Sequence, residues 1–378
     1  MKILLFDAGS YTYRDILTAF TKMGHSCRTV FYHFPDRYED VFFEERLTEY
    51  LAEHTYDRVF SVNFFPLVAK VCDRCHIRYL SWSYDSPLEE RLQDFFQYET
   101  NRIFLFDRLE AEEYRKKGFQ NVYHLPLAVD TDRLDRVLAG KNPSQKFCGR
   151  VSFVGKIYDS PLDGLLSLAD DYCKGYIRGI LQAQMGVYGA YFVEELLTAE
   201  LLDTINLSYE KIGQKSVRLT RRGLSHAVAA KITQQERRAH LMLSAERFDT
   251  RLYTYAGTLP EGMPKNCGLL KYYEEMPFVF RHSHLNLNIT LKDIRSGIPL
   301  RALDIMGSKG VLLSNYQPEL AEWFQDNVDV ILYGSLKEAL DKMDFYLKHE
   351  DLRKKIALNG YRKVKRYFSY EERIRQIL

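Results

Sequence analysis

Short apolar runs typical of buried strands alternate with amphipathic, helix-like segments along most of this 378-residue chain. The run Lys2–Phe6 is followed by helical spacing over residues 13–25, and the same order of strand and helix continues to about residue 130. Continuous apolar runs of this length are typical of parallel strands buried on both faces. The alternation therefore predicts a doubly wound α/β sheet in the first part of the chain.

The pattern starts again at residues 151–155, VSFVG, and strand-like runs return after residue 250. We therefore expect a first Rossmann-like domain over 1–140 and a second over 150–365, with a helical insertion at about 162–247. Gly, Asn, Pro and Ser gather in residues 138–149, which indicates a linker. Residues 366–378 form a last helix, which either packs on its own domain or crosses back to the first.

Net charge, cysteine content and the lengths of the apolar stretches argue against several classes of protein. A net charge of +2 argues against a dedicated nucleic-acid binder. Six scattered cysteines in a chain of this length indicate reduced thiols and a cytoplasmic location, and only Cys72 and Cys75 are close together. We see no second pair that would complete a zinc site, no targeting segment and no apolar stretch long enough to span a membrane.

Two open parallel sheets that face each other form a cleft, and ligands bind there at the carboxyl ends of the strands. Dinucleotide-binding enzymes and two-domain glycosyltransferases share this plan. The loops after the two first strands, DAGSYTYRD and VGKIYDS, hold one glycine each, so the dinucleotide fingerprint is missing from both domains. A P-loop is missing as well, which argues against a kinase or ATPase.

The stretch SGIPLRALDIMGSKG, which begins at Ser296, is the main candidate for binding a nucleotide sugar. The start of its helix offers N–H groups to a phosphate, and Gly297, flanked by Ser296 and Ile298, lets the ligand approach the backbone. Arg301 adds a donor for a diphosphate, and Asp304, one turn further on, can accept the hydroxyls of a ribose. The alternative is a plain helix in which Arg301 and Asp304 pair at i, i+3.

Four segments resemble one known family: NLNITLKDIRSGIPLRALDIMGSKGVLLSNYQPELAEWF, LLFDAGSYTYRDILTAFTKMGH, SWSYDSP and VSFVGKIYDSPLD. They look like the motifs of the CgeB-type, spore-maturation glycosyltransferase-like proteins of bacteria. The resemblance covers most of the chain. It implies the glycosyltransferase-B (GT-B) fold, a nucleotide-sugar donor and no requirement for a metal or another cofactor.

The resemblance also implies roles for single residues. The retaining branch of this fold carries a Glu, seven residues and a second Glu; the second falls on Asp304 here and the first on Ser296, which has no carboxylate. Lys309 stands where the family usually has Gly. We interpret that lysine either as a surface variation or as an extra cation near the diphosphate.

Further donor contacts are expected at two other strand ends. Gly155 and Lys156 follow the strand SFVG, and Lys156 is our second choice, after Arg301, for stabilising the leaving diphosphate. In YTYAG, the backbone around Tyr253 would read the edge of the base, with Tyr255 stacked on its ring. The alternatives are a solvated lysine and an aromatic core strand.

The first domain should bind the acceptor and supply a general base if the reaction inverts the anomeric centre. Asp85 in SWSYDSP is the leading candidate for the base, although a turn-forming role before Pro87 is equally compatible with the sequence. Asp7, after the first strand, is the alternative base.

The loops of the first domain also carry residues suited to contacting an acceptor. These are Ser10, Tyr11, Tyr13 and Trp82, although each is also an ordinary core type. The acceptor stays open among a protein such as flagellin or a coat protein, a glycan and a small molecule. An oligomer is compatible with the sequence.

These observations favour a metal-independent glycosyltransferase that uses a nucleotide-diphosphate sugar, with uridine as the expected base. A catalytically silent relative that binds nucleotide sugar or glycan is the alternative, because Ser296 lacks the acid. A nucleotide-sugar epimerase on the same fold is a third option.

Overall fold

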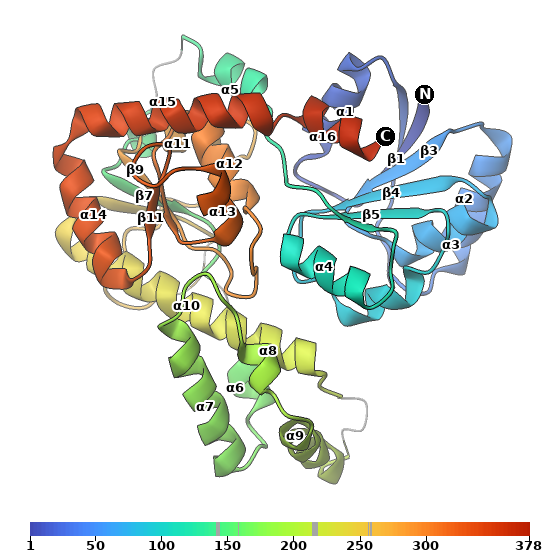
Figure 1. Ribbon diagram of the computed structural model, residues 1–378, viewed down its shortest axis with the longest axis horizontal. Helices are drawn as coiled ribbons and strands as arrows, with labels where there is room; N and C mark the ends of the chain where they lie inside the picture. The colour runs from blue at the N-terminus through green and yellow to red at the C-terminus, as the bar shows by residue number, and fades with distance from the viewer. Residues whose placement is uncertain (141–143, 158, 214–217, 256, 258) are drawn as a thin grey trace. The chain divides into compact units, whose positions relative to one another are not determined.

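The structure is a computed structural model that describes residues 1–140, 144–157, 159–213, 218–255, 257 and 259–378. The chain divides into two compact units. Unit 1 consists of Met1–Thr131 and Val364–Leu378, and unit 2 of Asp132–Lys363. Each unit contains one parallel sheet with helices packed beside it (Figure 1).

The sheet of unit 1 has the strand order β2-β1-β3-β4-β5-β6, and the paired strands are all parallel. Its strands are β1 (Lys2–Asp7), β2 (Ser26–Phe31), β3 (Arg58–Val62), β4 (Arg78–Ser83), β5 (Asn101–Leu105) and β6 (Val122–His124). Its helices are α1 (Tyr13–Lys22), α2 (Val41–Glu53), α3 (Pro66–Arg74), α4 (Arg108–Lys116) and α16 (Tyr370–Ile377), with a 3₁₀ turn over Glu90–Phe95.

The sheet of unit 2 has the order β11-β10-β9-β7-β8, again parallel. Its strands are β7 (Val151–Val154), β8 (Thr250–Tyr253), β9 (Leu285–Asn288), β10 (Leu312–Asn315) and β11 (Ile331–Tyr333). The helices that accompany it are α5 (Thr131–Leu138), α11 (Met276–His282), α12 (Leu300–Gly307), α13 (Pro318–Trp323), α14 (Leu336–Lys348) and α15 (Glu350–Tyr367), and a 3₁₀ turn covers Gln145–Phe147.

Burial explains why these short runs form strands. All residues of β7, β9, β10 and β11 are buried, as expected when helices cover both faces of a parallel sheet.

Several helices begin at side chains that accept hydrogen bonds from the free N–H groups of the first turn. Thr220 accepts a hydrogen bond from Gly223 N (3.1 Å) at the start of α10 (Arg221–Arg247), and Ser335 accepts one from Glu338 N (3.1 Å) at the start of α14.

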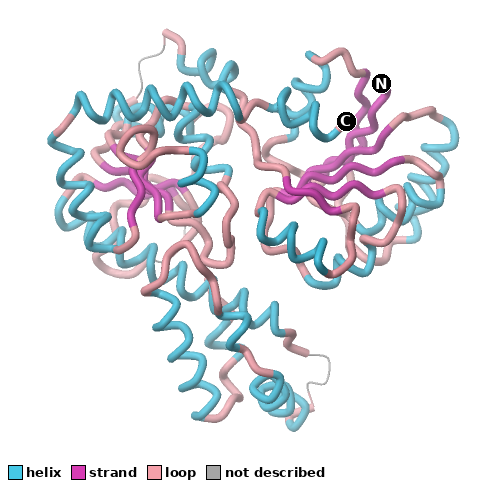
Figure 2. Tube along the Cα trace, viewed as in Figure 1, coloured by secondary structure: helices cyan, strands magenta, loops and turns pink. Residues whose placement is uncertain are grey.

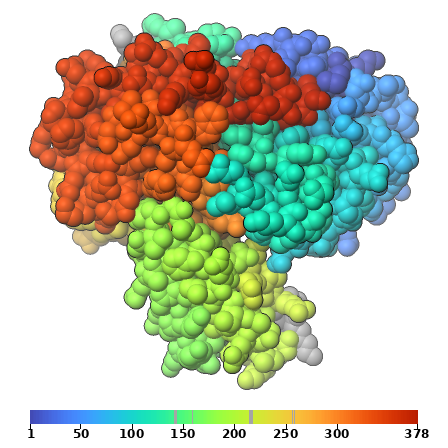
Figure 3. Space-filling view, viewed as in Figure 1, coloured from blue at the N-terminus to red at the C-terminus, as the bar shows by residue number. Residues whose placement is uncertain are grey.

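Within its described residues, the segment between β7 and β8 contains helices and the loops that join them, and no strand (Figure 2). It contains α6 (Leu162–Leu165), α7 (Asp171–Met185), α8 (Val193–Leu196), α9 (Ala199–Lys211) and α10. The first four pack around an apolar cluster of their own with the N-terminal part of α10. Figure 3 shows the green and yellow-green atoms of this segment gathered in one lobe, and α10 runs from there to contact α14.

The last helix belongs to unit 1. Val129 N donates to Phe368 O at 2.9 Å, and α16 packs against α1. The ring of Tyr370 lies edge-on to Trp82, with centroids 6.1 Å apart, at the end of β4. Aromatic contacts of this geometry add to the stability gained from burial.

The boundary after unit 1 lies earlier than residue 140, the limit expected from the sequence. Helix α5 is grouped with unit 2 from Asp132 onward, because Asp135 bonds to Lys309 Nζ at 2.6 Å and to Tyr361 Oη at 2.5 Å. Of the expected linker, residues 141–143 lie outside the described residues.

The turn that ends α12 depends on two residues. Lys309 has a left-handed backbone (φ 58°), which explains why glycine suits this position. Gly310 is required for a different reason: a Cβ there would lie 2.4 Å from Phe280 O and 3.0 Å from Ile305 O.

We therefore expect Gly310→Ala to destabilise unit 2 by about 3 kcal/mol, because the added methyl group would collide with backbone atoms that cannot move independently. Gly179→Ala, in α7, is the matched control: a Cβ there meets no atom within 4 Å. That change should stabilise the helix by about 0.5–1 kcal/mol. Scanning calorimetry measures both, and equal thermal midpoints for the two variants would contradict the role given to Gly310.

Candidate functional site

The candidate site of unit 2 lies where the direction of chain winding reverses. From β7 the chain first adds β8 on one side and then β9 on the other. In open parallel sheets, ligands bind outside the carboxyl ends of the strands at this switch point. The segments that leave these ends are Gly155–Lys156 after β7 and the loop over residues 289–299 between β9 and α12, which we call the β9–α12 loop.

Asp304 is a buried carboxylate on α12, with 4% of its surface exposed. Tyr272 Oη donates to its Oδ1 at 2.9 Å. Its Oδ2 has no hydrogen-bond partner among the described residues; the nearest cation is Arg301 Nη1 at 3.7 Å. Burial raises the pKa of Asp304, against the opposing effects of Arg301 and Tyr272. An acceptor atom is thus held in the protein without a full set of donors.

The start of α12 is not capped by a side chain, because its N-cap is Pro299. The N–H groups of a first helical turn are anion-binding groups. Arg301, expected to bind a diphosphate, lies beside Asp304 and contacts the Met276 sulfur and the Phe280 ring (5.5 Å). The pair at i, i+3 that the sequence offered as the alternative is therefore present.

Sequence reasoning missed two aromatic residues and an arginine beside Asp304. Tyr272 and Tyr273 lie between β8 and α11, and Arg133 of α5 stacks over both rings, at 5.5 and 4.7 Å from their centroids. The letters KYYEE carried no fingerprint that would point to the ribose carboxylate. The hydrogen bond from Tyr272 spans 32 residues of sequence, and only the folded chain shows it.

Charged groups on α10 hold the β9–α12 loop from one side. Lys292 pairs with Glu236 at 2.7 Å, and each side chain is only 6% exposed. Lys292 N also donates to Thr233 Oγ1 at 3.0 Å. Arg237 donates to the carbonyl groups of Ile289 and of Lys156 (2.5 Å), and so it joins the two segments that leave the switch point.

A histidine and an aspartate form a second link between α10 and this loop. His226 Nδ1 lies 2.7 Å from Asp293 Oδ2; the imidazole is half exposed and the carboxylate is buried. The hydrogen bond to Asp293 raises the pKa of His226, and burial raises the pKa of Asp293. Each shift favours the protonated form of its group, and the hydrogen bond between them ties the loop to the helix.

Ser296, Gly297 and Ile298 are all buried in the same loop. Ser296 Oγ donates to Glu319 Oε1 at 2.7 Å, so a buried carboxylate from α13 lies beside the position that lacks an acid. Ile298 is 1% exposed. Its side chain is a core residue, so only its backbone stays available to the donor.

Of the residues expected to contact the donor after β7 and β8, some are exposed and others are bound within the protein. Lys156 is exposed, and Gly155 N donates to Tyr253 O at 3.1 Å. The ring of Tyr253 is buried and its hydroxyl donates to Lys146 O at 2.6 Å, so only its backbone stays available to a ligand. Tyr255 is 70% exposed, as a residue that stacks on a base must be.

In unit 1 the two candidate bases lie at the carboxyl ends of β1 and β4, which β3 separates in the sheet. Asp7 accepts hydrogen bonds from Gly9 N and Ser10 N, so it shapes the loop after β1. Asp85, after β4, is exposed and accepts from Asn63 Nδ2 at 2.7 Å. Asn63 also accepts from Tyr84 N and adopts a left-handed backbone (φ 65°). It is therefore a positioning residue for Asp85, which the sequence did not reveal.

The expected acceptor residues separate into two groups. Ser10, Tyr11 and Tyr13 lie on or beside the loop after β1, and Tyr11 is 78% exposed. Tyr13 is bound through its hydroxyl to Thr29. Trp82 is fully buried and donates to Leu125 O, so it is a core residue, and its expected role as a platform is wrong in this structure.

Lys309 lies at the carboxyl end of α12, opposite the helix start that would meet a phosphate. Its ammonium group pairs with Asp135 and lies 4.6 Å from the centre of the Tyr361 ring. These contacts favour the first of its two interpretations, a local variation with no role at the diphosphate.

Comparison with known proteins gives one family match. Residues 224–378, which include the β9–α12 loop and α12, match a family described as glycosyl transferase-like. No curated protein matches the sequence significantly. None of the described helices is both long and apolar enough to cross a membrane.

Three solved structures resemble the chain over nearly its whole length, each at 9% identity. A glycosyltransferase from Rickettsia africae has a TM-score of 0.53 (99% of this chain, 96% of that one). The Anabaena protein HepE, in complex with UDP and glucose, has a TM-score of 0.54, and the match covers 100% of this chain and 98% of that one. Sucrose-phosphate synthase from Thermosynechococcus elongatus has 0.56 (100% and 97%).

At this identity the similarity shows the fold, and the fold is GT-B. The prediction of two Rossmann-like α/β halves of the GT-B type is confirmed. The family match and the fold together support a glycosyltransferase.

The raised pKa of Asp304 gives a prediction for stability. A carboxyl group whose pKa is higher in the folded than in the unfolded chain contributes most below the unfolded value, about 3.9, and this contribution is lost as the pH rises through the folded pKa. Asp304→Asn should therefore be more stable than the parent by about 1 kcal/mol at pH 7, and the gain should disappear near pH 4.

Thermal unfolding between pH 4 and 8 measures this difference. Asp203→Asn, an exposed position on α9, is the control and should follow the parent at every pH. A gain for Asp304→Asn that is independent of pH would show that the burial of charge at this position is not its cause.

Proposed function

We propose that this protein transfers a sugar from a nucleotide-diphosphate donor to an acceptor hydroxyl without a metal ion, as a CgeB-type glycosyltransferase. One observation carries the proposal: the buried Asp304 presents an oxygen with no hydrogen-bond partner among the described residues, at the switch point of unit 2. Burying a carboxylate without partners is costly unless a ligand supplies them. The two vicinal hydroxyls of a ribose are donors of the required kind.

The diphosphate of the donor would lie at the uncapped start of α12. Lys156 is exposed close to the switch point, and Arg301 already lies on α12, so each can add positive charge as the leaving group develops. These groups supply the stabilisation that a metal ion supplies in other phosphate chemistry. Tyr255 offers an exposed ring for the base.

Uridine is the base we propose. The support comes from the similar fold of HepE, which has been solved with UDP and glucose and with UDP-glucose. The identity of the transferred sugar, the acceptor and the stereochemical course are left open by this proposal. A protein such as flagellin or a coat protein, a glycan and a small molecule are the acceptor classes that we retain.

In the reaction, the acceptor oxygen forms a bond to the anomeric carbon while the bond from that carbon to the diphosphate oxygen breaks. If the anomeric centre is inverted, a base must take the acceptor proton, and we propose Asp85 for this role. Its exposure and the hydrogen bond from Asn63, which orients the carboxylate, support the choice. Asp7 is less suited because one of its oxygens already binds two backbone N–H groups.

A catalytically silent binding protein is the second candidate, because Ser296 stands in place of an acid. The contact between Ser296 and the buried Glu319 weakens this argument, since a carboxylate lies beside that position. Hydrolysis of UDP-glucose without an acceptor separates the two candidates, because a silent binder should release no UDP.

Six free cysteines support the proposal that the protein works in the reducing bacterial cytoplasm.

We expect Asp304→Ala to weaken UDP binding by ~1–3 kcal/mol, since the hydrogen bonds to the ribose would be lost. Isothermal titration calorimetry of the folded variant measures the change. Asp203→Ala is the matched control and should bind as the parent does. Unchanged affinity for UDP in Asp304→Ala would overturn the assignment of the ribose carboxylate.

Asp85→Asn should lower the rate of UDP-glucose hydrolysis by about 10²–10⁴-fold, because the amide cannot accept the proton, and should leave the affinity for UDP unchanged. Asn63→Ala should lower the rate less. The carboxylate of Asp85 is still present in this variant and can accept a proton, although the amide no longer orients it. If Asp7→Asn abolishes hydrolysis while Asp85→Asn does not, the base is Asp7.

A further inference from the structure

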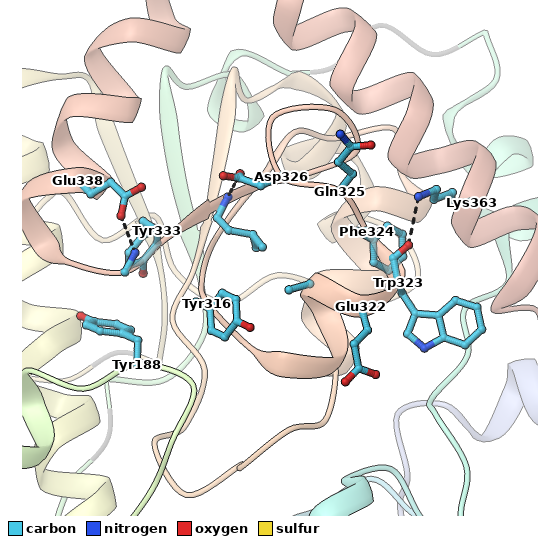
Figure 4. Close-up of a pocket in the computed structure, with 13 residues that line it drawn as sticks. Tyr188, Tyr316, Glu322, Trp323, Phe324, Gln325, Asp326, Tyr333, Glu338 and Lys363 are labelled. Atoms are coloured by element: carbon cyan, nitrogen blue, oxygen red, sulfur yellow. Dashed lines mark hydrogen bonds between the residues drawn. The ribbon is translucent and has the colours of Figure 1, made fainter.

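Unit 2 contains a cavity whose described lining residues differ from those of the candidate nucleotide site. Its volume is about 670 Å³, within the range of small-molecule pockets, roughly 300–1,000 Å³. It lies at the ends of β10 and β11 and is lined by α13, the start of α14 and the loop after α7 (Figure 4). Its described lining residues do not include Asp304, Arg301, Lys156 or Tyr255.

The aromatic ring of Tyr316 forms part of the wall of this cavity. Tyr316 is 40% exposed, and its N–H donates to Tyr333 O at 2.8 Å. Its ring packs directly on Gly189, which has a left-handed backbone (φ 77°); a Cβ there would lie 2.6 Å from ring atoms Cδ1 and Cε1. The glycine therefore permits the ring to lie against the backbone. A second ring, that of Tyr188, lines the same side (Figure 4).

Two carboxylates of the wall, those of Glu338 and Asp326, are bound to the same lysine. Lys342 binds Glu338 Oε1 at 2.9 Å and Asp326 Oδ2 at 3.2 Å. The other oxygens of these carboxylates accept from Gly334 N and Leu332 N, each at 2.7 Å. The oxygens of both carboxylates are thus hydrogen-bonded, but one lysine offsets only one of the two negative charges, so this part of the wall disfavours an inorganic anion.

Lys363, at the other side of the cavity, is likewise bound to Asp329 Oδ2 at 2.5 Å. Polar groups that suit a neutral ligand also line the space. The amide of Gln325 both donates and accepts, and the carboxylate of Glu322 accepts hydrogen bonds from hydroxyl groups (Figure 4).

We propose that this cavity is a carbohydrate-binding site, distinct from the nucleotide site, that holds part of a glycan acceptor or product. A pyranose presents an apolar face of C–H bonds, which packs on an aromatic ring, and a rim of hydroxyls, which bond to amide and carboxylate groups. The ring of Tyr316, the hydrogen-bonded carboxylates and the amide of Gln325 fit this hydroxyl-rich ligand. The choice of a sugar among neutral polar ligands rests on the proposed function.

The test is a titration of the full chain, without nucleotide, by saturation-transfer difference NMR. The probes are the methyl glycosides of glucose, galactose, mannose and N-acetylglucosamine, and a trisaccharide of glucose. We expect at least one probe to bind, and Tyr316→Ala to weaken it by about 3- to 10-fold through loss of the stacking surface. Tyr316→Phe keeps the ring and should bind nearly as the parent does.

Tyr172→Ala is the matched control, because Tyr172 is 73% exposed on α7 and does not line the cavity. Its binding of glycosides should equal that of the parent. Asp304→Ala should lose UDP affinity and keep glycoside binding, while Tyr316→Ala should show the reverse. Failure of the nucleotide assignment and failure of the cavity assignment therefore give different results.

A second measurement covers the case in which Tyr316→Ala does not fold. The chain has two tryptophans: Trp82 is fully buried, and Trp323, which lines the cavity, is 39% exposed. Acrylamide quenching of the unmodified protein thus reports mainly Trp323, and a bound glycoside should reduce it. The proposal is overturned if no probe binds, if binding survives Tyr316→Ala unchanged, or if Asp304→Ala abolishes it.

Discussion

The buried pair between Lys292 and Glu236 is the interaction on which the candidate nucleotide site depends most. Irregular backbone segments seldom stay buried, because their polar groups need partners. The β9–α12 loop meets this need through α10, whose Glu236, Arg237 and Thr233 bind the loop from one side. Burial raises the pKa of Glu236, which shows that the pair is held against a cost of desolvation.

This arrangement links the helical insertion to the chemistry of the strand ends. Helix α10 is shared: apolar residues of its N-terminal part pack in the core of the insertion, and His226, Thr233 and Glu236 hold the β9–α12 loop. Arg237 reaches the carbonyls of residues 156 and 289, at the two strand ends of the switch point. The insertion is thus joined mechanically to both segments that would meet a donor.

Much of the fold was predictable because burial on both faces gives strands a strong local signal. The burial of Asp304 was also predictable, because its neighbours in the sequence are apolar and are typical of a buried helix. Tyr272, Asn63 and Arg133 were missed because their contacts join segments far apart in sequence. Trp82 and Ile298 were assigned to sites because aromatic and apolar types suit a core and a ligand surface equally.

The docking of α16 on unit 1 has a consequence for biosynthesis. Residues 364–378 complete the packing around Trp82 and Tyr370, yet the ribosome makes them only after all of unit 2. The N-terminal sheet must therefore wait, with part of its surface uncovered, for more than two hundred residues to be translated. A chain interrupted within that interval lacks α16 and leaves apolar surface of the first sheet exposed, as in other partly folded multidomain chains.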